Sequence, residues 1–362
     1  MGLTIVALPG DGVGREVVSS SLRVFQECVS KHGINVQVEE YKIGGQALEE
    51  YGEPLPDFVL EACKSSRIVL LGAVGDDRYD SNPPHLRPEQ ALLRLRKELG
   101  LFANLRPVRT SSPLLESSPL KARIVEGVDI LIVRELTGGI YFGEPRGIET
   151  RAEGRVGINT EVYFDYEVER IARVAFEASQ ERRQRVTSVD KSNVLESSQL
   201  WRTVVTELSR DFPKVTLQHM LVDNCAMQLI ARPKDFDVLL ANNLFGDILS
   251  DEAAMLTGSI GMLPSASLGE SSAQGRIGMY EPVHGTAPDI AGQEKANPLA
   301  TIASVALLFR YSLGRDDIGR EIENAIERTL ERGYRTPDIA TEGGHLLGTQ
   351  EMVDQVLEAL QS

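Results

Sequence analysis

The sequence predicts an α/β protein. Short apolar or β-branched runs alternate with longer segments whose apolar residues recur at helical spacing, which is typical of parallel strands joined by crossover helices. The chain has 362 residues, of which 42% are hydrophobic and 25% charged, a composition typical of a folded protein. At roughly 150 residues per domain, this length predicts about two domains.

Each predicted strand is a short apolar run that polar residues or glycine follow closely. In chain order we expect strands at Leu3–Leu8, Val36–Tyr41, Ile68–Leu71, Ile130–Val133, Val186–Val189, Leu217–Val222 and Val238–Ala241. Each predicted helix has apolar residues at i, i+3, i+4 and i+7. In chain order we expect helices at Arg15–Val29, Pro88–Leu99, Tyr166–Arg182, Ser198–Arg210, Ile248–Leu256, Pro298–Leu313, Gly319–Arg332 and Glu351–Leu360.

The charge balance disfavours some kinds of partner. There are 53 acidic and 38 basic residues, and the net charge of −15 repels nucleic-acid phosphates and anionic lipid. The most apolar stretch, Leu299–Phe309, is shorter than the ~18 residues that would span a bilayer. Because the first residues run into a strand without a basic leader, we expect a cytoplasmic protein.

The cysteines and histidines do not predict a metal cluster. Cys28, Cys63 and Cys225 are far apart and odd in number, which favours free thiols in a reducing compartment. The 5 histidines show no ligand spacing either.

A glycine-rich segment, Pro9–Arg15, follows the first strand and precedes the first helix, where dinucleotide-binding folds place a pyrophosphate loop. The fingerprint G-x-G-x-x-G would need glycine at Arg15, and no acidic ribose ligand stands about 20 residues further on. The pattern therefore favours a tight turn near a ligand over a pyrophosphate cradle.

Two aspartates, Asp247 and Asp251, are four positions apart on a predicted helix and share one face. Like charges at this spacing are unfavourable, and a divalent cation bound by carboxylate oxygens would explain them. The alternative is that Asp247 caps the helix and Asp251 is solvated. Asp223, directly after a predicted strand, is a candidate third ligand.

The helix after Pro88 has a face of mixed chemistry, on which Glu89, Leu92, Leu93 and Arg96 are offset by three, four and seven positions. This order places a carboxylate, then an aliphatic surface, then a guanidinium on one side of the helix. Such a face suits a ligand that has both an aliphatic group and a negative charge.

Two further arginines, Arg106 and Arg134, lie near apolar sequence, where an unpaired charge would be costly. Together with Arg96 they suggest bidentate recognition of carboxylates. The alternative is a set of structural ion pairs, for example with Glu135 or Glu98.

Two residues could move protons. Tyr141 lies in a glycine-rich loop, and Lys191 ends the apolar run 186–190. A tyrosine can donate a proton and a lysine at a buried strand end can serve as a base, although each residue taken separately is more often a packing tyrosine or a surface lysine.

The segment Glu281–Gly292, followed by Asn297, is rich in small residues and proline. It suggests a rigid loop whose backbone amides could approach phosphate, with Asp289 available to accept hydrogen bonds from a ribose diol.

Taken together, these segments resemble the β-decarboxylating dehydrogenases, the isocitrate/isopropylmalate dehydrogenase family. The motifs occur in family order: LPGDGVG at 8–14, LRK at 95–97, FANLRP at 102–107, VRELTGGIYFG at 133–143, VDKSNVL at 189–195, NLFGDILSD at 243–251 and HGTAPDIAG at 284–292. Residues 149–160 match the family pattern poorly and are expected to form a variable arm near a dimer contact. Cys225 stands where relatives often have alanine.

The resemblance implies a two-domain, non-Rossmann α/β fold. One domain is formed by both termini, residues 1–103 and 257–362, and carries the cofactor. The other, residues 104–256, binds the metal and makes an obligate homodimer.

The resemblance is closest to members that act on 3-isopropylmalate in leucine biosynthesis, with NAD and Mg²⁺ or Mn²⁺ as cofactors. It implies oxidation of the C2 hydroxyl with hydride transfer to NAD, followed by loss of CO2. The roles that it implies are substrate binding by Arg96, Arg106 and Arg134, metal binding by Asp223, Asp247 and Asp251, and proton transfer by the catalytic residues Lys191 and Tyr141. Lys191 and Asp223, which also lies at the substrate, would come from the partner subunit.

The resemblance also implies the specificity. Leu92, Leu93 and, from the partner, Val194 would hold the isopropyl group, while Glu89 would repel the extra carboxylate of isocitrate. Asp289 would accept from the 2′-hydroxyl of NAD and repel the 2′-phosphate of NADP, whose users carry Lys and Tyr at positions 289 and 290. The cofactor residues implied are Glu89, Asn193, Glu281, His284, Gly285, Thr286, Ala287, Pro288, Asp289, Ile290 and Asn297.

Other functions compete with this one. Dehydrogenases acting on homoisocitrate, tartrate or malate share almost every catalytic residue and differ around Glu89, Leu92 and Leu93. A non-catalytic regulatory subunit would be expected to have lost the acid or the base, yet Tyr141 and Lys191 are both present. An RNA-binding role lacks a basic stripe.

Overall fold

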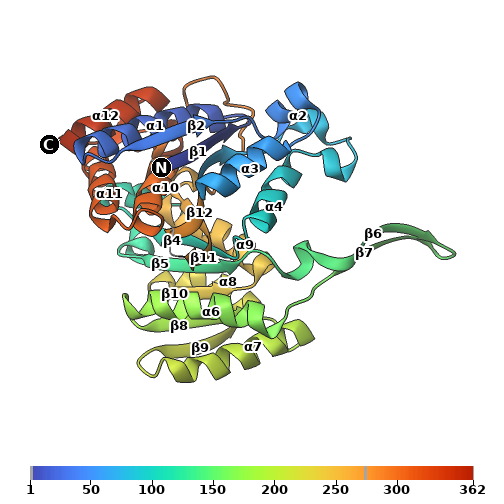
Figure 1. Ribbon diagram of the computed structural model, residues 1–362. Helices are drawn as coiled ribbons and strands as arrows, with labels where there is room; N and C mark the ends of the chain where they lie inside the picture. The colour runs from blue at the N-terminus through green and yellow to red at the C-terminus, as the bar shows by residue number, and fades with distance from the viewer. Residues whose placement is uncertain (1–2, 273–274, 362) are drawn as a thin grey trace.

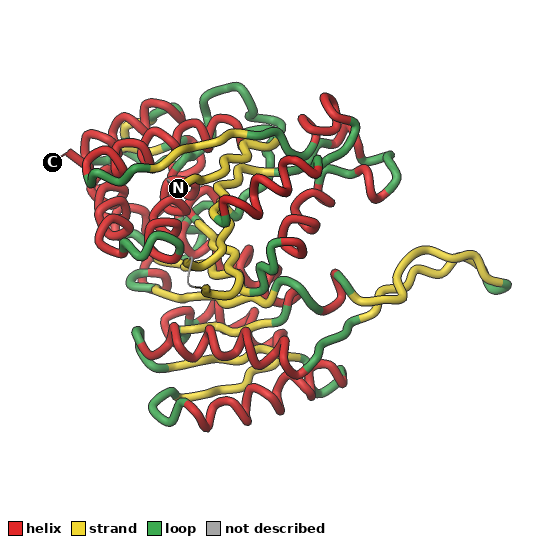
Figure 2. The backbone as a smooth tube through the Cα atoms, in the orientation of Figure 1, coloured by secondary structure: helices red, strands yellow, loops and turns green. Residues whose placement is uncertain are grey.

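A single ten-stranded sheet runs through the computed structural model, which describes residues 3–272 and 275–361 (Figures 1 and 2). Its strands in spatial order are β2 (Val36–Glu40), β1 (Leu3–Gly10), β3 (Ile68–Ala73), β12 (Gly275–Pro282), β11 (Pro264–Ser272), β4 (Ala103–Arg109), β5 (Asp129–Glu135), β10 (Val238–Ala241), β8 (Arg185–Asp190) and β9 (Thr216–Leu221). The predicted α/β class is confirmed, and all seven predicted strands are present.

The helices cover both faces of this sheet. They are α1 (Gly14–Lys31), α2 (Gly45–Tyr51), α3 (Asp57–Ser66), α4 (Glu89–Glu98), α5 (Ala122–Val125), α6 (Asp165–Gln180), α7 (Glu196–Leu208), α8 (Val222–Ala231), α9 (Asn243–Ala254), α10 (Leu299–Tyr311), α11 (Asp316–Glu331) and α12 (Thr349–Gln361). All eight predicted helices are present, and the short helices α2, α3, α5 and α8 were not predicted.

The prediction of parallel pairing is wrong at the centre of the sheet. The pairs β12–β11, β11–β4 and β4–β5 are antiparallel, whereas the pairs on either side are parallel. The strands β4, β11 and β12 were not predicted. Strand β4 contains two arginines and Pro107, and β11 is built mainly of serine, glycine and alanine, so neither has the β-branched composition that favours strands.

The core follows from the alternation of side chains along each strand. On β1, Ile5 and Ala7 pack in one cluster with α1 and α10, while Val6 and Leu8 pack in another with α3 and α4. On β5, the alternate residues likewise separate between a cluster that includes α6 and a cluster that includes α8 and α9. Helix α10 is apolar on nearly all sides and correspondingly buried.

A long hairpin extends away from the body of the molecule (Figure 1). It consists of β6 (Gly143–Arg151) paired antiparallel with β7 (Gly154–Thr160), and we call it the arm. The stretch 149–160, expected to be a variable arm, lies within it. The remaining two-stranded sheet pairs β13 (Tyr334–Arg335) with β14 (His345–Leu346).

All three cysteines are buried and unpaired, as the sequence predicts. Burial raises the pKa of the Cys28, Cys63 and Cys225 thiols to about 12 in each case. No helix in the described part of the chain is both long enough and apolar enough to cross a membrane.

Candidate active site

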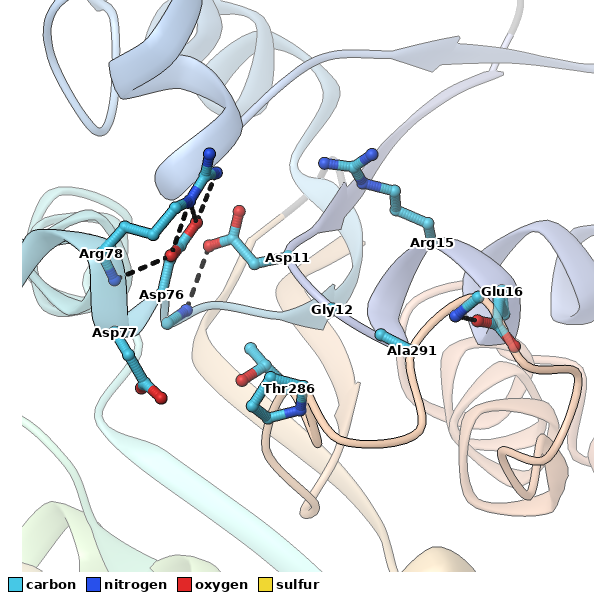
Figure 3. Close-up of a pocket in the computed structure, with 12 residues that line it drawn as sticks. Asp11, Gly12, Arg15, Glu16, Asp76, Asp77, Arg78, Thr286 and Ala291 are labelled. Carbon is cyan, nitrogen blue, oxygen red and sulfur yellow. Dashed lines mark hydrogen bonds and ion pairs between the residues drawn. The ribbon is translucent and has the colours of Figure 1, made fainter.

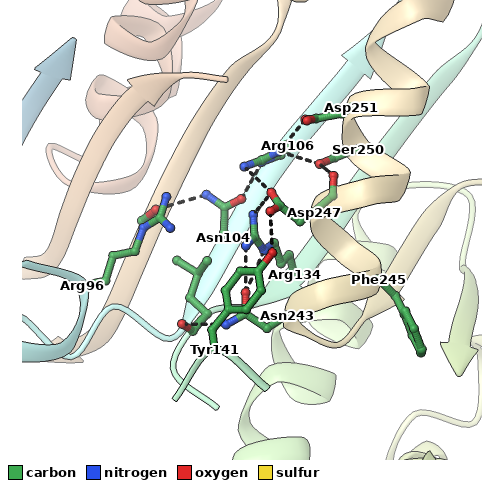
Figure 4. A network of polar contacts seen from close by, with 12 residues as sticks. Arg96, Asn104, Arg106, Arg134, Tyr141, Asn243, Phe245, Asp247, Ser250 and Asp251 are labelled. Carbon is green, nitrogen blue, oxygen red and sulfur yellow. Dashed lines mark hydrogen bonds and ion pairs between the residues drawn. The ribbon is translucent and has the colours of Figure 1, made fainter. Parts of the chain in front are cut away.

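The three predicted arginines lie buried beside the centre of the sheet (Figure 4). Arg96 is on α4, and Arg106 and Arg134 are on the antiparallel neighbours β4 and β5. In this order the three arginines are 8%, 6% and 2% exposed, so each buried guanidinium needs partners that compensate its charge. Burial and the neighbouring Arg106 lower the pKa of Arg134 to about 10, which still leaves it charged at neutral pH.

These partners are acidic or amide side chains. Arg96 Nη2 donates to Glu281 Oε1 at 3.0 Å, and Arg106 Nη1 lies 3.3 Å from Asp251 Oδ1. Arg134 Nη1 contacts Asp247 Oδ1. The alternative of structural ion pairs is therefore confirmed for all three arginines. Only the partners suggested for them are wrong, because Glu98 pairs with Lys64, while Glu135 accepts hydrogen bonds from Thr137 and Gly138.

Uncharged side chains that were not predicted brace the same guanidinium groups. Asn243 Oδ1 accepts from Arg134 Nε at 3.1 Å and from Nη2 at 2.8 Å. Arg106 donates to Asn104 Oδ1 at 2.8 Å and to Ser250 Oγ at 2.5 Å. These three residues lie close in sequence to the predicted arginines and aspartates. That nearness could have suggested them, but short polar residues are so common in sequences that it does not single them out.

Helix α9 places Asp247 and Asp251 on the face that meets β4 and β5. Both carboxylates approach Arg106, with Asp247 Oδ1 3.7 Å from Nη2, so the predicted shared face is confirmed. The alternative that Asp247 caps the helix is wrong, because Asn242 Oδ1 accepts from Phe245 N at 2.8 Å as the cap. The helix therefore begins five residues before the predicted start at Ile248.

The environments of the two aspartates differ. Burial pushes the pKa of Asp247 upward, but Arg134 and Arg106 outweigh that effect and bring the pKa below its ordinary value. The pKa of Asp251 is raised by burial and by repulsion from Asp247, against the pull of Arg106. The side chain of Asp251 is 58% exposed, so this carboxylate is open to a ligand.

Tyr141 contacts this network directly. It ends a short 3-10 turn, Gly139–Tyr141, and its hydroxyl donates to Asp247 Oδ2 at 2.9 Å. Burial and the Asp247 charge raise the pKa of Tyr141, which keeps the phenol protonated at neutral pH. The Arg134 guanidinium lies 5.8 Å from the centre of its ring.

Lys191 and Asp223 form a separate pair, with Lys191 Nζ 2.7 Å from Asp223 Oδ1. Asp223 lies in the first turn of α8 and not at the end of a strand, because the chain turns helical at Val222. The Lys191 ammonium lowers the pKa of Asp223. In the described residues no three His, Cys, Asp or Glu side chains gather as possible metal ligands, so Asp223 does not join Asp247 and Asp251 within one chain.

A cavity of about 600 Å³ opens beside the network, and we call it the α4 cavity. Glu89, Leu92 and Leu93 of α4 line it together with Tyr141 and Asp247. The predicted mixed face of α4 thus meets the predicted acid and one of the aspartates. Val194 does not line the cavity and is 61% exposed in the single chain, and its neighbour Asn193 is also exposed.

The predicted cofactor loop joins β12 to α10. His284 Nδ1 lies 2.9 Å from the Gly285 carbonyl oxygen, and burial lowers the pKa of His284. Gly285, Pro288 and Asp289 are exposed, whereas Ala287 and Ile290 are half-buried. Asn297 is buried, and its Oδ1 accepts from Leu299 N at 2.9 Å while its Nδ2 donates to Asp338 Oδ2 at 3.0 Å.

This loop and the first glycine turn together line a second cavity, of about 550 Å³ (Figure 3). The Thr286 carbonyl accepts from Val13 N at 2.9 Å, and a Cβ on Gly12 would lie only 2.0 Å from that carbonyl oxygen. Asp11 braces the turn by accepting from Gly45 N and Gly75 N. The prediction of a tight turn is confirmed, and the turn lines a cavity large enough for a ligand.

The comparisons with known proteins agree with these motifs. A family model described as isocitrate/isopropylmalate dehydrogenase matches residues 4–356. The chain belongs to this family. It is 54% identical to the 3-isopropylmalate dehydrogenase of Symbiobacterium thermophilum, over 98% of this chain and 97% of that protein. It is 55% identical to that of Gloeobacter violaceus, over 99% and 98%.

A plant relative and two solved structures extend the comparison. The chain is 54% identical to the chloroplastic 3-isopropylmalate dehydrogenase 2 of Arabidopsis thaliana, over 99% of this chain and 88% of that protein. The isocitrate dehydrogenase of Methylococcus capsulatus superposes with a TM-score of 0.87 at 32% identity, with both chains fully covered. A β-decarboxylating dehydrogenase of Thermococcus kodakarensis superposes with a TM-score of 0.79 at 34% identity, over 100% and 96%. The predicted membership of the isocitrate/isopropylmalate dehydrogenase family, and with it the enzyme class, is confirmed.

Proposed function

We propose that this protein oxidises and decarboxylates (2R,3S)-3-isopropylmalate to 4-methyl-2-oxopentanoate, with reduction of NAD, as a step of leucine biosynthesis. The observation that carries the proposal is the junction of two kinds of surface. Asp247, which Arg106 and Arg134 contact from the buried side, lines one cavity together with the aliphatic side of α4. The proposed substrate, a branched hydroxy-diacid, matches both surfaces, because it has two carboxylates for the charged side and an isopropyl group for the aliphatic side.

Arg96, Arg106 and Arg134 bind the two substrate carboxylates. A guanidinium offers two parallel N–H donors to a carboxylate, and a buried setting strengthens each charge-assisted hydrogen bond. Leu92 and Leu93 receive the isopropyl group, at about 0.8 kcal/mol for each CH2-sized unit buried. Glu89, in the same cavity, disfavours a substrate with a third carboxylate, such as isocitrate.

The donor set suits a hard divalent cation. Asp247 and Asp251 supply carboxylate oxygens from adjacent turns of α9, and their mutual repulsion is only partly neutralised by arginine. They would hold Mg²⁺ or Mn²⁺ together with Asp223 of a second copy. When bound, the cation supplies a Lewis acid for the negative charge that develops on the C2 oxygen.

One side chain from each of the two copies moves a proton. Lys191 of the second copy, once it is a neutral amine, would accept the C2 hydroxyl proton. NAD, when bound, would supply the acceptor for the hydride from C2. The C3–carboxylate bond then breaks, CO2 departs, and the electron pair remains as an enolate. Tyr141 delivers a proton to C3, directly or by relay, and its raised pKa supports the role of donor.

The loop from Glu281 to Asn297 holds NAD, with Asn193 of the second copy and Glu89 completing the site. The exposed Asp289 carboxylate accepts hydrogen bonds from a ribose diol and repels a 2′-phosphate, which favours NAD over NADP. Comparing kcat/KM for the two cofactors tests this preference, and equal values would contradict it.

The working unit is a homodimer with shared sites. Helices α8 and α9 pack against each other and expose the large apolar side chains of Met227, Ile230 and Ile248, and Met255, directly after α9, is exposed as well. Contact with a second copy would remove these surfaces from water. The two-domain division at residues 103 and 256 stays a prediction. It is supported by the sheet, whose first five strands in spatial order come from residues 3–73 and 264–282 and whose last five come from residues 103–241.

NADH formation from 3-isopropylmalate, with and without EDTA, tests the proposal. We expect turnover that EDTA abolishes and that Mg²⁺ or Mn²⁺ restores. Homoisocitrate, isocitrate, tartrate and malate serve as competing substrates and should each give a much lower kcat/KM. A higher kcat/KM for any of them would replace the proposed substrate, and activity that survives complete metal removal would contradict the metal site.

A further inference from the structure

The α4 cavity contains a charge that the sequence motifs do not assign. Arg146, on the arm, lines the cavity together with Asn159 from the opposite strand. Among the described residues that line this cavity, Arg146 is the only cation, whereas Glu89 and Asp247 are anionic. A negatively charged ligand entering here therefore meets one attractive side chain and two repulsive ones.

An irregularity at the base of the arm places Arg146 there. Gly143 pairs with Thr160 and Gly147 pairs with Ile158, so residues 144–146 lie opposite a single residue, Asn159. Such bulges redirect side chains and occur next to active sites. A Cβ on Gly143 would lie 1.9 Å from the Thr160 carbonyl oxygen, so glycine is needed for the two strands to approach this closely.

The hydrogen bonds of Arg146 tie it to the proton donor and leave its charge without a carboxylate partner. Its Nη1 donates to the backbone carbonyl of Tyr141, and its backbone N–H donates to Glu144 Oε2 at 3.1 Å. In the described part of the chain no carboxylate lies within 4.0 Å of its guanidinium. Arg96, Arg106 and Arg134, by contrast, each have an acidic partner.

We propose that Arg146 is a fourth carboxylate-binding arginine, which attracts the dianionic substrate into the cavity and contacts one of its carboxylates at the mouth. In a protein of net charge −15, an unpaired arginine at the entrance offsets long-range repulsion of the substrate. The inference rests on the proposed function, since it takes a hydroxy-diacid as the ligand.

The experiment compares wild type with Arg146→Gln and Arg146→Lys, using Arg155→Gln as the control. Arg155 lies opposite Thr150 further out on the same arm and outside the cavity, so its replacement removes an equal charge. Steady-state kinetics with 3-isopropylmalate are measured between about 20 and 200 mM salt, a range over which screening changes strongly. Thermal unfolding verifies that each variant is folded.

For Arg146→Gln we expect KM to rise about tenfold, as for one lost charge-assisted hydrogen bond, with kcat within about twofold of wild type. The fall of kcat/KM with salt should be shallower than in wild type. Arg146→Lys should keep the salt dependence and recover part of the KM, because the charge remains but the paired donors do not. Arg155→Gln should match wild type.

Equal KM and salt dependence in Arg146→Gln and Arg155→Gln would overturn the role of Arg146 and leave the proposed function intact. A loss confined to kcat would also overturn it, since the effect would then lie in the chemistry at Tyr141. Wild-type protein that turns over none of the hydroxy acids would overturn the proposed function and this inference together.

Discussion

Arg106 shows how buried charge is tolerated at this site. Its guanidinium is nearly inaccessible to water, yet Asn104, Ser250 and the two α9 carboxylates surround it. Removing a single partner from such a network leaves a buried charge uncompensated, which costs several kcal/mol. The network is therefore fixed in position before any ligand arrives, which is what recognition of a carboxylate requires.

His284 gives a pH-dependent prediction at the residue scale. Burial lowers its pKa below the ordinary 6.5, so the folded protein binds the proton less readily than the unfolded chain does. The neutral ring therefore contributes fully to the free energy of unfolding above pH 6.5. This contribution is lost as the pH falls from 6.5 toward the lower pKa of the folded state. We expect the melting temperature of the ligand-free protein to fall between about pH 7 and pH 5, and to fall less in His284→Gln.

Differential scanning calorimetry of both proteins across this range provides the measurement, and NMR titration of the His284 ring provides an independent one. The same pH dependence in wild type and variant, or a ring pKa at or above 6.5, would contradict the prediction.

At the scale of elements, the contact between α9 and β5 depends on a glycine. A Cβ on Gly246 would lie 2.7 Å from Arg134 Cγ and 2.8 Å from its Cβ, and an atom so near the backbone of β5 cannot swing away. Helix α9 can therefore approach the sheet closely enough for Asp247 to contact Arg134.

We expect Gly246→Ala to lower the free energy of unfolding by about 1–2 kcal/mol, because overpacking exceeds the gain of about 1 kcal/mol in helix propensity. The displacement of Asp247 should also reduce kcat/KM. Urea denaturation and steady-state kinetics measure the two effects. Gly157→Ala is the control, since no atom lies within 4 Å of its would-be Cβ. A Gly246→Ala variant as stable and active as this control would refute the argument.

The elements differ in how well sequence predicted them. Parallel strands such as β10, with the sequence VLLA, are buried on both faces and are therefore easily predicted from their apolar runs. Strand β4 carries charged residues because it lines the site, and β11 carries small residues because it packs against close neighbours. Neither composition is typical of a strand, so neither strand could be predicted from its sequence. The two α9 aspartates could be predicted because like charges four positions apart on a helix are unfavourable, and Arg106 and Arg134 because they lie near apolar sequence. Arg146 could not, because only the irregular pairing of the arm directs it into the cavity.

At the scale of the whole molecule, the separation of Lys191 and Asp223 from Asp247 and Asp251 is the main reason to expect shared sites. The first two pair with each other, the other two contact the arginines, and in the described chain they do not form one ligand group. A symmetric dimer brings the same two surfaces together twice.

This arrangement predicts complementation between two inactive variants. Lys191→Met and Asp247→Asn should each abolish turnover as homodimers. After the two are mixed and the subunits exchanged, half of the dimers are mixed and each has one intact site, so about a quarter of wild-type activity should return. Activity measured before and after exchange provides the test, with two batches of Lys191→Met as the negative control. No recovery despite proven exchange would place each site within one chain.

The burial of all three thiols has a practical consequence. A maleimide reagent has no native sulfur to attack in the folded protein, since Cys28, Cys63 and Cys225 are inaccessible to solvent. A cysteine substituted for the exposed Glu153, at the tip of the arm, would accept a dye at one chosen point without first removing the others. Fluorescence from that point would then report on the surroundings of the arm while the enzyme works.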